Sequence, residues 1–131
     1  QAENRARFLP LIQQAEADNG LPPGLLDRVL YQESRYRSDI IEGRTVSTAG
    51  AVGIAQIVPR WHPGVDATDP EQSIFYAARY LATLYRQFGD WSSALAAYNW
   101  GPGNVAEHGM ADLPDETREY VASITSDVGI A

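Results

Sequence analysis

Apolar residues recur every three or four positions along most of the chain, a spacing that predicts α-helices. The first such segment places Phe8, Leu11, Ile12 and Ala15 on one helical face. It ends at Asn19-Gly20, a pair typical of a helix C-terminus. A second helix is expected to begin near Pro22-Pro23 and to run through Glu33. No stretch of useful length alternates apolar and polar residues as a strand would, so the pattern predicts a mainly α fold.

The clearest helical signal follows Asp69, which has the side chain of an N-cap. Pro70 then occupies the first helical position and Gln72 the capping-box position. Its apolar stripe consists of Ile74, Ala78, Leu81, Leu84, Tyr85 and Phe88. Gly89 closes the helix. The sequence therefore predicts a helix from about 70 to 88.

Two shorter helices complete the pattern. Asp90 can cap a helix that ends at 101–103, and another helix starts near Asp115 with Tyr120, Val121 and Ile124 on one face. Between Arg35 and Gly53 the periodicity disappears, and glycines with Ser and Thr predict an irregular loop. Loops of this length inside a compact domain are often functional.

Size and charge narrow the classes of protein. A chain of 131 residues with 44% hydrophobic residues is expected to form one domain, residues 1–131. The net charge of -7 argues against nucleic acid or an anionic membrane as the main partner. Zero cysteines exclude disulfides and thiolate chemistry, and no apolar run approaches the roughly 20 residues that span a bilayer. Because the chain starts at Gln1 without a leader, we expect a mature form or an excised domain.

Glu33 stands where the pattern of its helix calls for an apolar side chain. It continues the face formed by Leu26, Val29 and Leu30. Burial would disfavour the charged carboxylate, which suits a general acid that works near neutral pH. An ion pair with Arg28 or Arg35 is the structural alternative, and the helix alone leaves both interpretations open.

Four short motifs occur together with Glu33. They are Y-Q-E-S at 31–34, G-I-A-Q-I at 53–57, A-Y-N-W-G-P-G at 97–103 and E-T-R-E-Y-V at 116–121. In this order and spacing the chain closely resembles the soluble lytic transglycosylase family over roughly residues 21–124. The resemblance implies a lysozyme-like, mainly helical single domain with a glycan-binding cleft. It also implies cleavage of the glycan strands of bacterial peptidoglycan without water.

The resemblance assigns Glu33 as the catalytic residue. As an acid it would protonate the β-1,4 linkage oxygen between N-acetylmuramic acid and N-acetylglucosamine, and as a base it would then take the proton of the muramic 6-hydroxyl, closing a 1,6-anhydro ring. Glycosidases ordinarily use two carboxyl groups. The other acids, Asp39, Glu42, Asp66 and Glu107 among them, lie outside the four motifs, which favours the single-acid mechanism.

Substrate-binding roles are implied for five further residues, Ser47, Gln56, Tyr98, Asn99 and Tyr120. Three of them have a structural alternative: Ser47 suits a turn, Gln56 could cap or pack inside a short helix, and Tyr98 could belong to the core. No cofactor is expected, and His62 and His108 lack the spacing of a zinc site. The expected partner is peptidoglycan, with the chain as part of a larger protein or assembly in the periplasm, the cell envelope or a virion.

Two other functions share the expected architecture. A hydrolase of the goose-type lysozyme kind would deliver water to the anomeric carbon and usually needs an additional acid. An inactive glycan-binding or assembly module could retain the fold without the reaction. The joint presence of Glu33, Gln56, Tyr98, Asn99 and Tyr120 argues against the inactive module.

Overall fold

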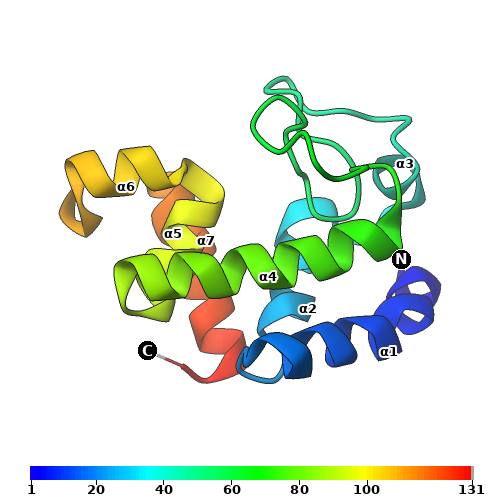
Figure 1. The fold of residues 1–131 in the computed structure, drawn as a ribbon, viewed down its shortest axis with the longest axis horizontal. Coiled ribbons are helices and arrows are strands. Elements are labelled where there is room, and N and C mark those ends of the chain that lie inside the picture. The colour runs from blue at the N-terminus through cyan, green and yellow to red at the C-terminus, as the bar shows by residue number, and fades with distance from the viewer. Residues whose placement is uncertain (131) are drawn as a thin grey trace. The chain divides into compact units, whose positions relative to one another are not determined.

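The computed structural model describes residues 1–130, and within them it contains seven α-helices and one short 3-10 helix but no strand. The predicted mainly α fold is therefore confirmed. The chain divides into two compact units, Gln1–Arg79 and Tyr80–Ala131, and the boundary falls inside the longest helix. Figure 1 follows the elements in chain order.

Helices α1 (Ala2–Asn19) and α2 (Leu25–Ser34) pack against each other in the first unit. Their apolar faces are buried, through Phe8, Ile12 and Ala15 on α1 and Leu25, Leu26, Val29 and Leu30 on α2. Gly20 ends α1 in the left-handed conformation, as the sequence predicts. The carboxylate of Glu16 is buried and accepts a hydrogen bond from the backbone N–H of Leu26 at 2.9 Å, so α1 satisfies a free donor at the start of α2.

The predicted irregular loop begins with a short helix that the sequence did not indicate. Helix α3 comprises Ser38–Ile41 and buries Ile41. Four residues are too few to show a helical period, which explains why the pattern missed it. The rest of the segment up to residue 69 is a series of turns, with one isolated antiparallel bridge between Val52 and Ile57. This loop region contributes the second predicted motif.

Helix α4 comprises Pro70–Phe88, as predicted. At its start the Asp69 carboxylate accepts hydrogen bonds from the backbone N–H and the side-chain amide of Gln72, at 3.2 and 3.1 Å. This arrangement confirms the predicted N-cap. Its apolar stripe is buried from Ile74 through Leu84.

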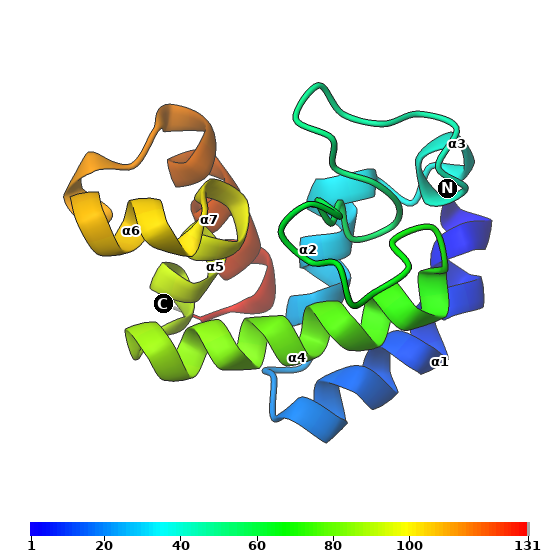
Figure 2. The same cartoon turned by 45° about the horizontal axis from the view of Figure 1, so that its top comes forward.

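The second unit contains α5 (Trp91–Trp100), α6 (Pro102–His108), the 3-10 helix η1 (Met110–Asp112) and α7 (Asp115–Val128). The Asp90 carboxylate caps α5 by accepting from Ser93 N–H at 2.7 Å. Helix α5 packs on both α6 and α7, which Figure 2 shows from a second direction. The sequence predicted α5 and α7 but took Gly101-Pro102-Gly103 only as an end. Gly101 does end α5, and Pro102, with its preset φ, begins α6.

Candidate functional site

Glu33 is the penultimate residue of α2 and is half-buried. The residues that share its helical face, Leu26, Val29 and Leu30, are fully buried. Its side chain therefore lies at the margin of the core, less deeply than the sequence pattern predicted. Arg28 and Arg35 place their guanidinium groups over the ring of Tyr31. The general acid and the ion pair with Arg28 or Arg35 therefore both stay predictions for Glu33.

The turn directly after Glu33 has an unusual backbone. Arg35 and Tyr36 both have φ of 54°, in the left-handed region that residues other than glycine normally avoid. Two such residues in succession cost on the order of 1–3 kcal/mol each. Ser34, which is fully buried, donates its hydroxyl to the carbonyl of Leu30 and accepts from Tyr36 N–H. The chain thus makes a sharp, strained exit from α2 beside Glu33.

A buried polar network of Arg5, Asp27 and Tyr36 stabilises this turn. The Tyr36 side chain is 1% exposed, and its hydroxyl donates to the Asp27 carboxylate at 2.7 Å. Arg5 of α1 donates to the same carboxylate through two nitrogens, the shortest contact being 2.6 Å. Such a bidentate pair fixes geometry as well as charge. The network ties α1, α2 and the turn together.

The pKa shifts in this network follow from its geometry. Burial would raise the pKa of Asp27, but hydrogen bonds from Arg5 and Tyr36 and the charges of Arg5 and Arg28 outweigh it and hold that pKa below its usual value. Burial, followed by the hydrogen bond to Asp27, raises the pKa of Tyr36 far above its usual value. Asp27 is therefore a carboxylate and Tyr36 a neutral donor at physiological pH.

Ser47 is exposed and forms a turn of its own. Its hydroxyl accepts from the backbone N–H of Ala51 at 2.9 Å, and its backbone N–H donates to the carbonyl of Ala51. Gly50 N–H donates to the carbonyl of Ser47. The turn-forming role that sequence left open is thus present, and substrate binding by Ser47 stays a prediction.

The motif at 53–57 forms a tight turn closed by the Val52–Ile57 bridge. Gln56 has φ of 50°, and its side-chain amide donates to the carbonyl of Gly53 at 3.0 Å. Gly53 has φ of 80°, and a Cβ there would lie 1.9 Å from the carbonyl oxygen of Ala67. Glycine is required because that backbone passes so close. The close approach at Gly53 is therefore made by the protein's own backbone at Ala67.

The second unit carries the other three predicted residues. Tyr98 and Asn99 are half-buried on α5, and Tyr120 is buried on α7. The amide oxygen of Asn99 accepts from the hydroxyl of Thr117 at 2.8 Å, which links α5 to α7. The rings of Tyr98 and Tyr80 are 5.8 Å apart. The structure therefore groups Tyr98, Asn99 and Tyr120 in one unit, and Glu33, Ser47 and Gln56 in the other.

The histidines and tryptophans occupy different surroundings. His62 is half-buried, shares a hydrogen bond with the hydroxyl of Tyr76, and has its pKa lowered by burial. His108 is exposed. Trp91 stacks on Tyr85, whereas Trp61 is 69% exposed. In the part of the chain that the structure describes, no cluster of His, Asp and Glu could hold a metal ion.

Most other carboxylates of the loop region have structural partners. Asp39 pairs with Arg37 and Thr45, Asp66 with Thr68 through backbone and side chain, and Glu42 with Arg44. The Thr45 hydroxyl lowers the pKa of Asp39, and Thr68 lowers that of Asp66. Both therefore favour the charged form and are poorly suited to donate a proton near neutral pH.

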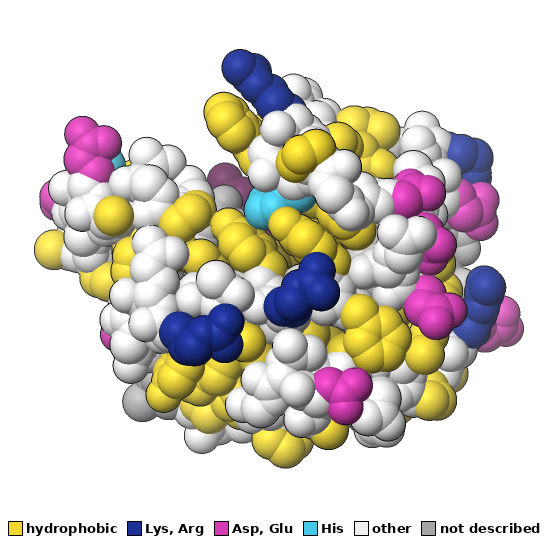
Figure 3. All heavy atoms as spheres, viewed as in Figure 1, with side chains coloured by type: hydrophobic (Ala, Val, Ile, Leu, Met, Phe, Trp, Pro, Cys, Tyr) yellow, Lys and Arg dark blue, Asp and Glu magenta, His cyan; other side chains and the backbone are white. Residues whose placement is uncertain are grey.

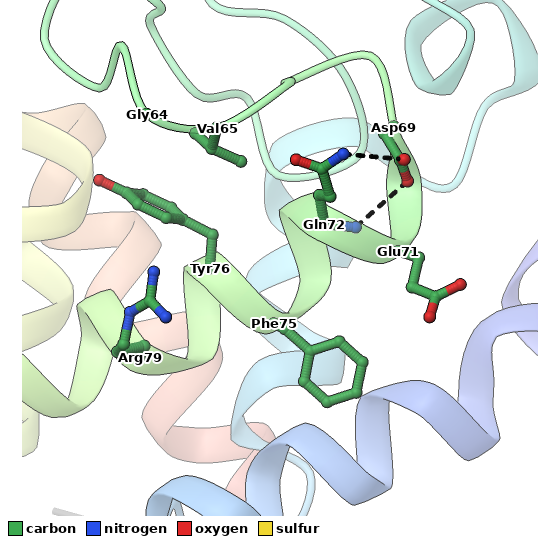
Figure 4. Close-up of a pocket in the computed structure, with 8 residues that line it drawn as sticks. All are labelled: Gly64, Val65, Asp69, Glu71, Gln72, Phe75, Tyr76 and Arg79. Atoms are coloured by element: carbon green, nitrogen blue, oxygen red, sulfur yellow. Dashed lines mark hydrogen bonds between the residues drawn. The ribbon is translucent and has the colours of Figure 1, made fainter.

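A shallow pocket of about 480 Å³ lies on the first unit, between the 64–65 turn and the start of α4. Figure 4 shows Tyr76 and Arg79 on one side and Gln72, bonded to Asp69, on the other. None of the six predicted site residues lines it. The pocket is therefore not the site that the motifs define.

Two structural features of the site were not predicted from the sequence. The Arg5–Asp27–Tyr36 network joins residues distant in the chain, and its only sequence signal was an aspartate within the apolar run of α2. Thr117 lies inside the fourth motif, yet its bond to Asn99 needs the packing of α5 on α7.

The fold is mainly helical, and the motif that contains Glu33 ends α2. Residues 10–121 match the family described as "Transglycosylase SLT domain", and the chain belongs to this family. The match includes residues of both units and all six predicted site residues.

Individual relatives agree with the family. The chain is 32% identical over 111 residues to "Membrane-bound lytic murein transglycosylase F 2" of Alkalilimnicola ehrlichii, which covers 77% of this chain and 24% of that protein. It is 36% identical over 120 residues to "Membrane-bound lytic murein transglycosylase F" of Maricaulis maris, and the match covers 79% of this chain and 24% of that protein. A "Transglycosylase" of Enterobacteria phage PRD1 is 30% identical over 119 residues, and the match covers 88% of this chain and 41% of the phage protein. The chain thus spans about a quarter of the bacterial relatives and two fifths of the phage protein.

Proposed function

We propose that this chain is a peptidoglycan lytic transglycosylase domain in which Glu33 is the single acid and base. The observation that carries the proposal is the position of Glu33: it lies within residues 10–121, which match the family, and is half-buried at the last turn of α2. Partial burial and the negative end of the helix dipole both favour a protonated carboxyl group. A proton donor is what the first step of glycan cleavage requires.

The reaction proceeds in two proton transfers. Glu33 donates its proton to the oxygen that links N-acetylmuramic acid to N-acetylglucosamine, and the bond from the muramic anomeric carbon to that oxygen breaks. The substrate's N-acetyl group assists at the anomeric carbon. Glu33, now a carboxylate, takes the proton of the muramic 6-hydroxyl, whose oxygen bonds to the same carbon. The products are an N-acetylglucosamine 4-hydroxyl end and a 1,6-anhydromuramic end, with no water consumed.

The hydrogen bonds of other acids in the first unit support a single-carboxylate mechanism. Asp27, Asp39 and Asp66 each accept hydrogen bonds from structural partners. A second carboxyl group placed to act on water is what a two-acid glycosidase needs. The hydrolase of the lysozyme kind is therefore the less supported alternative, and its product distinguishes it.

Substrate contacts are proposed for Ser47, Gln56, Tyr98, Asn99 and Tyr120, on the basis of the motif match. The amide of Gln56 and the hydroxyl of Tyr98 offer hydrogen bonds to sugar hydroxyl and acetamido groups. Ala substitution at any of the five should raise KM more than it lowers kcat if the residue binds the glycan uniformly.

The biological setting is the cell envelope or a virion. The relatives comprise bacterial proteins named as membrane-bound and a phage protein, all longer than this chain, so we propose that it works as one part of a larger protein. None of the helices from residue 1 to 130 is long and apolar enough to cross a membrane. On the face shown in Figure 3, basic side chains are dispersed and form no large patch, consistent with the net charge of -7.

Replacement of the acid tests the proposal. Glu33→Gln keeps the shape of the side chain but removes the proton, and we expect turnover of purified peptidoglycan to fall by about 10²-fold or more. Glu42→Gln is the matched control, because Glu42 is exposed and its salt bridge with Arg44 contributes little. Unchanged turnover in Glu33→Gln would contradict the role of Glu33.

A further inference from the structure

Side chains from the first turn of the chain are hydrogen-bonded to the backbone that follows Glu33. Gln1 donates to the carbonyl of Arg35 at 2.7 Å. Asn4 donates to the carbonyl of Tyr36 and to the hydroxyl of Ser38, both at 2.8 Å. Figures 1 and 2 both show the start of α1 beside α3, so the two segments are neighbours although more than thirty residues separate them.

Arg5 reaches the same turn indirectly. Its guanidinium group binds the Asp27 carboxylate, which in turn accepts the buried hydroxyl of Tyr36. Tyr36 is thereby fixed at both ends: Asn4 holds its carbonyl and Asp27 its hydroxyl. The side chains of Gln1, Asn4 and Asp27 are thus all hydrogen-bonded to the strained turn.

The backbone N–H groups of this turn find acceptors nearby, whereas two of its carbonyl groups accept from residues far away in the chain. Arg35 N–H donates to the carbonyl of Tyr31 and Arg37 N–H to that of Ser34, so local bonds satisfy donors. The carbonyls of Arg35 and Tyr36 accept instead from the side chains of Gln1, just before α1, and Asn4 in its first turn. A residue in the left-handed region persists only where its surroundings over-determine it.

We propose that Gln1, Asn4 and Arg5, which we call the N-terminal brace, hold the turn after Glu33 in the conformation that directs its carboxyl group at the glycan. All three lie before residue 10, where the family match begins, so the family motifs do not define them. They are positioning residues, and the proposal rests on the proposed role of Glu33 as the acid.

The test compares two variants of Asn4 with a matched control. Asn4→Ala removes both hydrogen bonds, and Asn4→Asp keeps the shape but replaces the donor with an acceptor. Gln13→Ala is the control, because Gln13 is exposed on the same helix and its side-chain amide forms no hydrogen bond among the described residues. Because alanine favours a helix at both positions, helix propensity does not separate Asn4→Ala from the control. An aspartate in the first turn also favours the helix dipole, so Asn4→Asp should not unfold α1.

Amide hydrogen exchange is the primary readout. We expect exchange at Arg35, Tyr36 and Arg37 to rise about tenfold or more in both Asn4 variants, with the amide of Leu30 in α2 unchanged. The NMR signal of the Glu33 carboxyl carbon should shift in both. With peptidoglycan, kcat should fall about three- to tenfold while KM changes little, since positioning acts on the reacting group.

Tyr36→Phe provides a second variant in the same turn. It removes the hydroxyl that binds Asp27 and should reproduce the exchange change at Arg35 and Arg37. Unaltered exchange and an unaltered Glu33 signal in Asn4→Ala, Asn4→Asp and Tyr36→Phe would overturn the brace. Altered exchange with an altered Glu33 signal, in a chain whose wild type yields no anhydromuramic product, would support the brace and overturn the proposed function.

Discussion

The turn after Glu33 and the turn between Val52 and Ile57 both contain residues in the left-handed region, yet they are stabilised in opposite ways. The first is held by the side chains of Gln1 and Asn4, more than thirty residues earlier in the chain, and by Asp27, nine residues before Tyr36. The second closes on itself, through backbone bonds between Val52 and Ile57 and the Gln56 side chain on Gly53.

This difference determines which changes each turn should tolerate. A turn held by distant side chains loses stability in steps, as each hydrogen bond is removed. A turn whose backbone packs directly against another backbone segment is destabilised when a single atom is added where no space exists. Substitutions in and around each turn separate these two kinds of stabilisation.

Gly53→Ala should have the largest effect. The new Cβ would lie 1.9 Å from the carbonyl oxygen of Ala67, and backbone must move to relieve the clash. With the cost of a positive φ added, we expect a loss of about 3 kcal/mol or more in the free energy of unfolding. Chemical denaturation would measure it.

Gly50→Ala is the control for this clash. Gly50 also has a positive φ, of 84°, but a Cβ there would meet nothing within 4 Å. Only the conformational cost applies, about 1 kcal/mol. Equal losses for the two variants would show that the contact with Ala67 is not what fixes the turn.

Asp27→Asn should have an intermediate effect that depends on pH. At pH 7 the variant loses a buried charge-assisted network, and we expect it to be about 1.5–3 kcal/mol less stable than the wild type. The pKa of Asp27 is lower in the folded protein than in the unfolded chain, where it is about 3.9. The ionised Asp27 therefore contributes its full share to the free energy of unfolding above about pH 3.9, and this share is lost as the pH falls through the folded-state pKa.

Denaturation of both proteins at several pH values between 7 and 2 would measure this. The stability gap between wild type and Asp27→Asn should narrow as the pH falls below about 4. A gap that stays constant to pH 2 would mean that the Asp27 charge does not stabilise the turn. Arg5→Met, which removes the other partner, should show the same narrowing.

Ser47→Ala should have the smallest effect on stability. Its hydroxyl accepts one exposed hydrogen bond, from Ala51 N–H, so the cost should be at most about 1 kcal/mol. Thr48→Ala is a neighbouring exposed control. A loss well above 1 kcal/mol would place Ser47 among the structural residues of the loop, whereas a rise in KM without that loss would support substrate binding.

The helices could be predicted because their signals are local. Asp69 and Gln72, Asp90 with Ser93, and Gly20 each cap a helix through groups within three or four residues. Helices α3 and α6 were missed because four and seven residues hardly display a period. In the second case, a Gly-Pro pair both ended one helix and began the next.

The candidate site was predictable only as far as its motifs reach. Glu33 and its placement at the end of α2 followed from the sequence, although its lesser burial did not. The bonds from Gln1 and Asn4, and the network of Arg5 with Asp27, depend on packing between α1 and α2 that no local pattern encodes. Long-range side-chain contacts are the part that required the structure.

The most direct test of the account is the chemistry of the cleaved glycan. Purified peptidoglycan would be digested with this chain and with Glu33→Gln, and the released muropeptides analysed by mass spectrometry. We expect products ending in 1,6-anhydromuramic acid, one water lighter than hydrolysis products, from the wild type and almost none from the variant. Reducing muramic acid ends would contradict it and would identify a hydrolase with a water-positioning group.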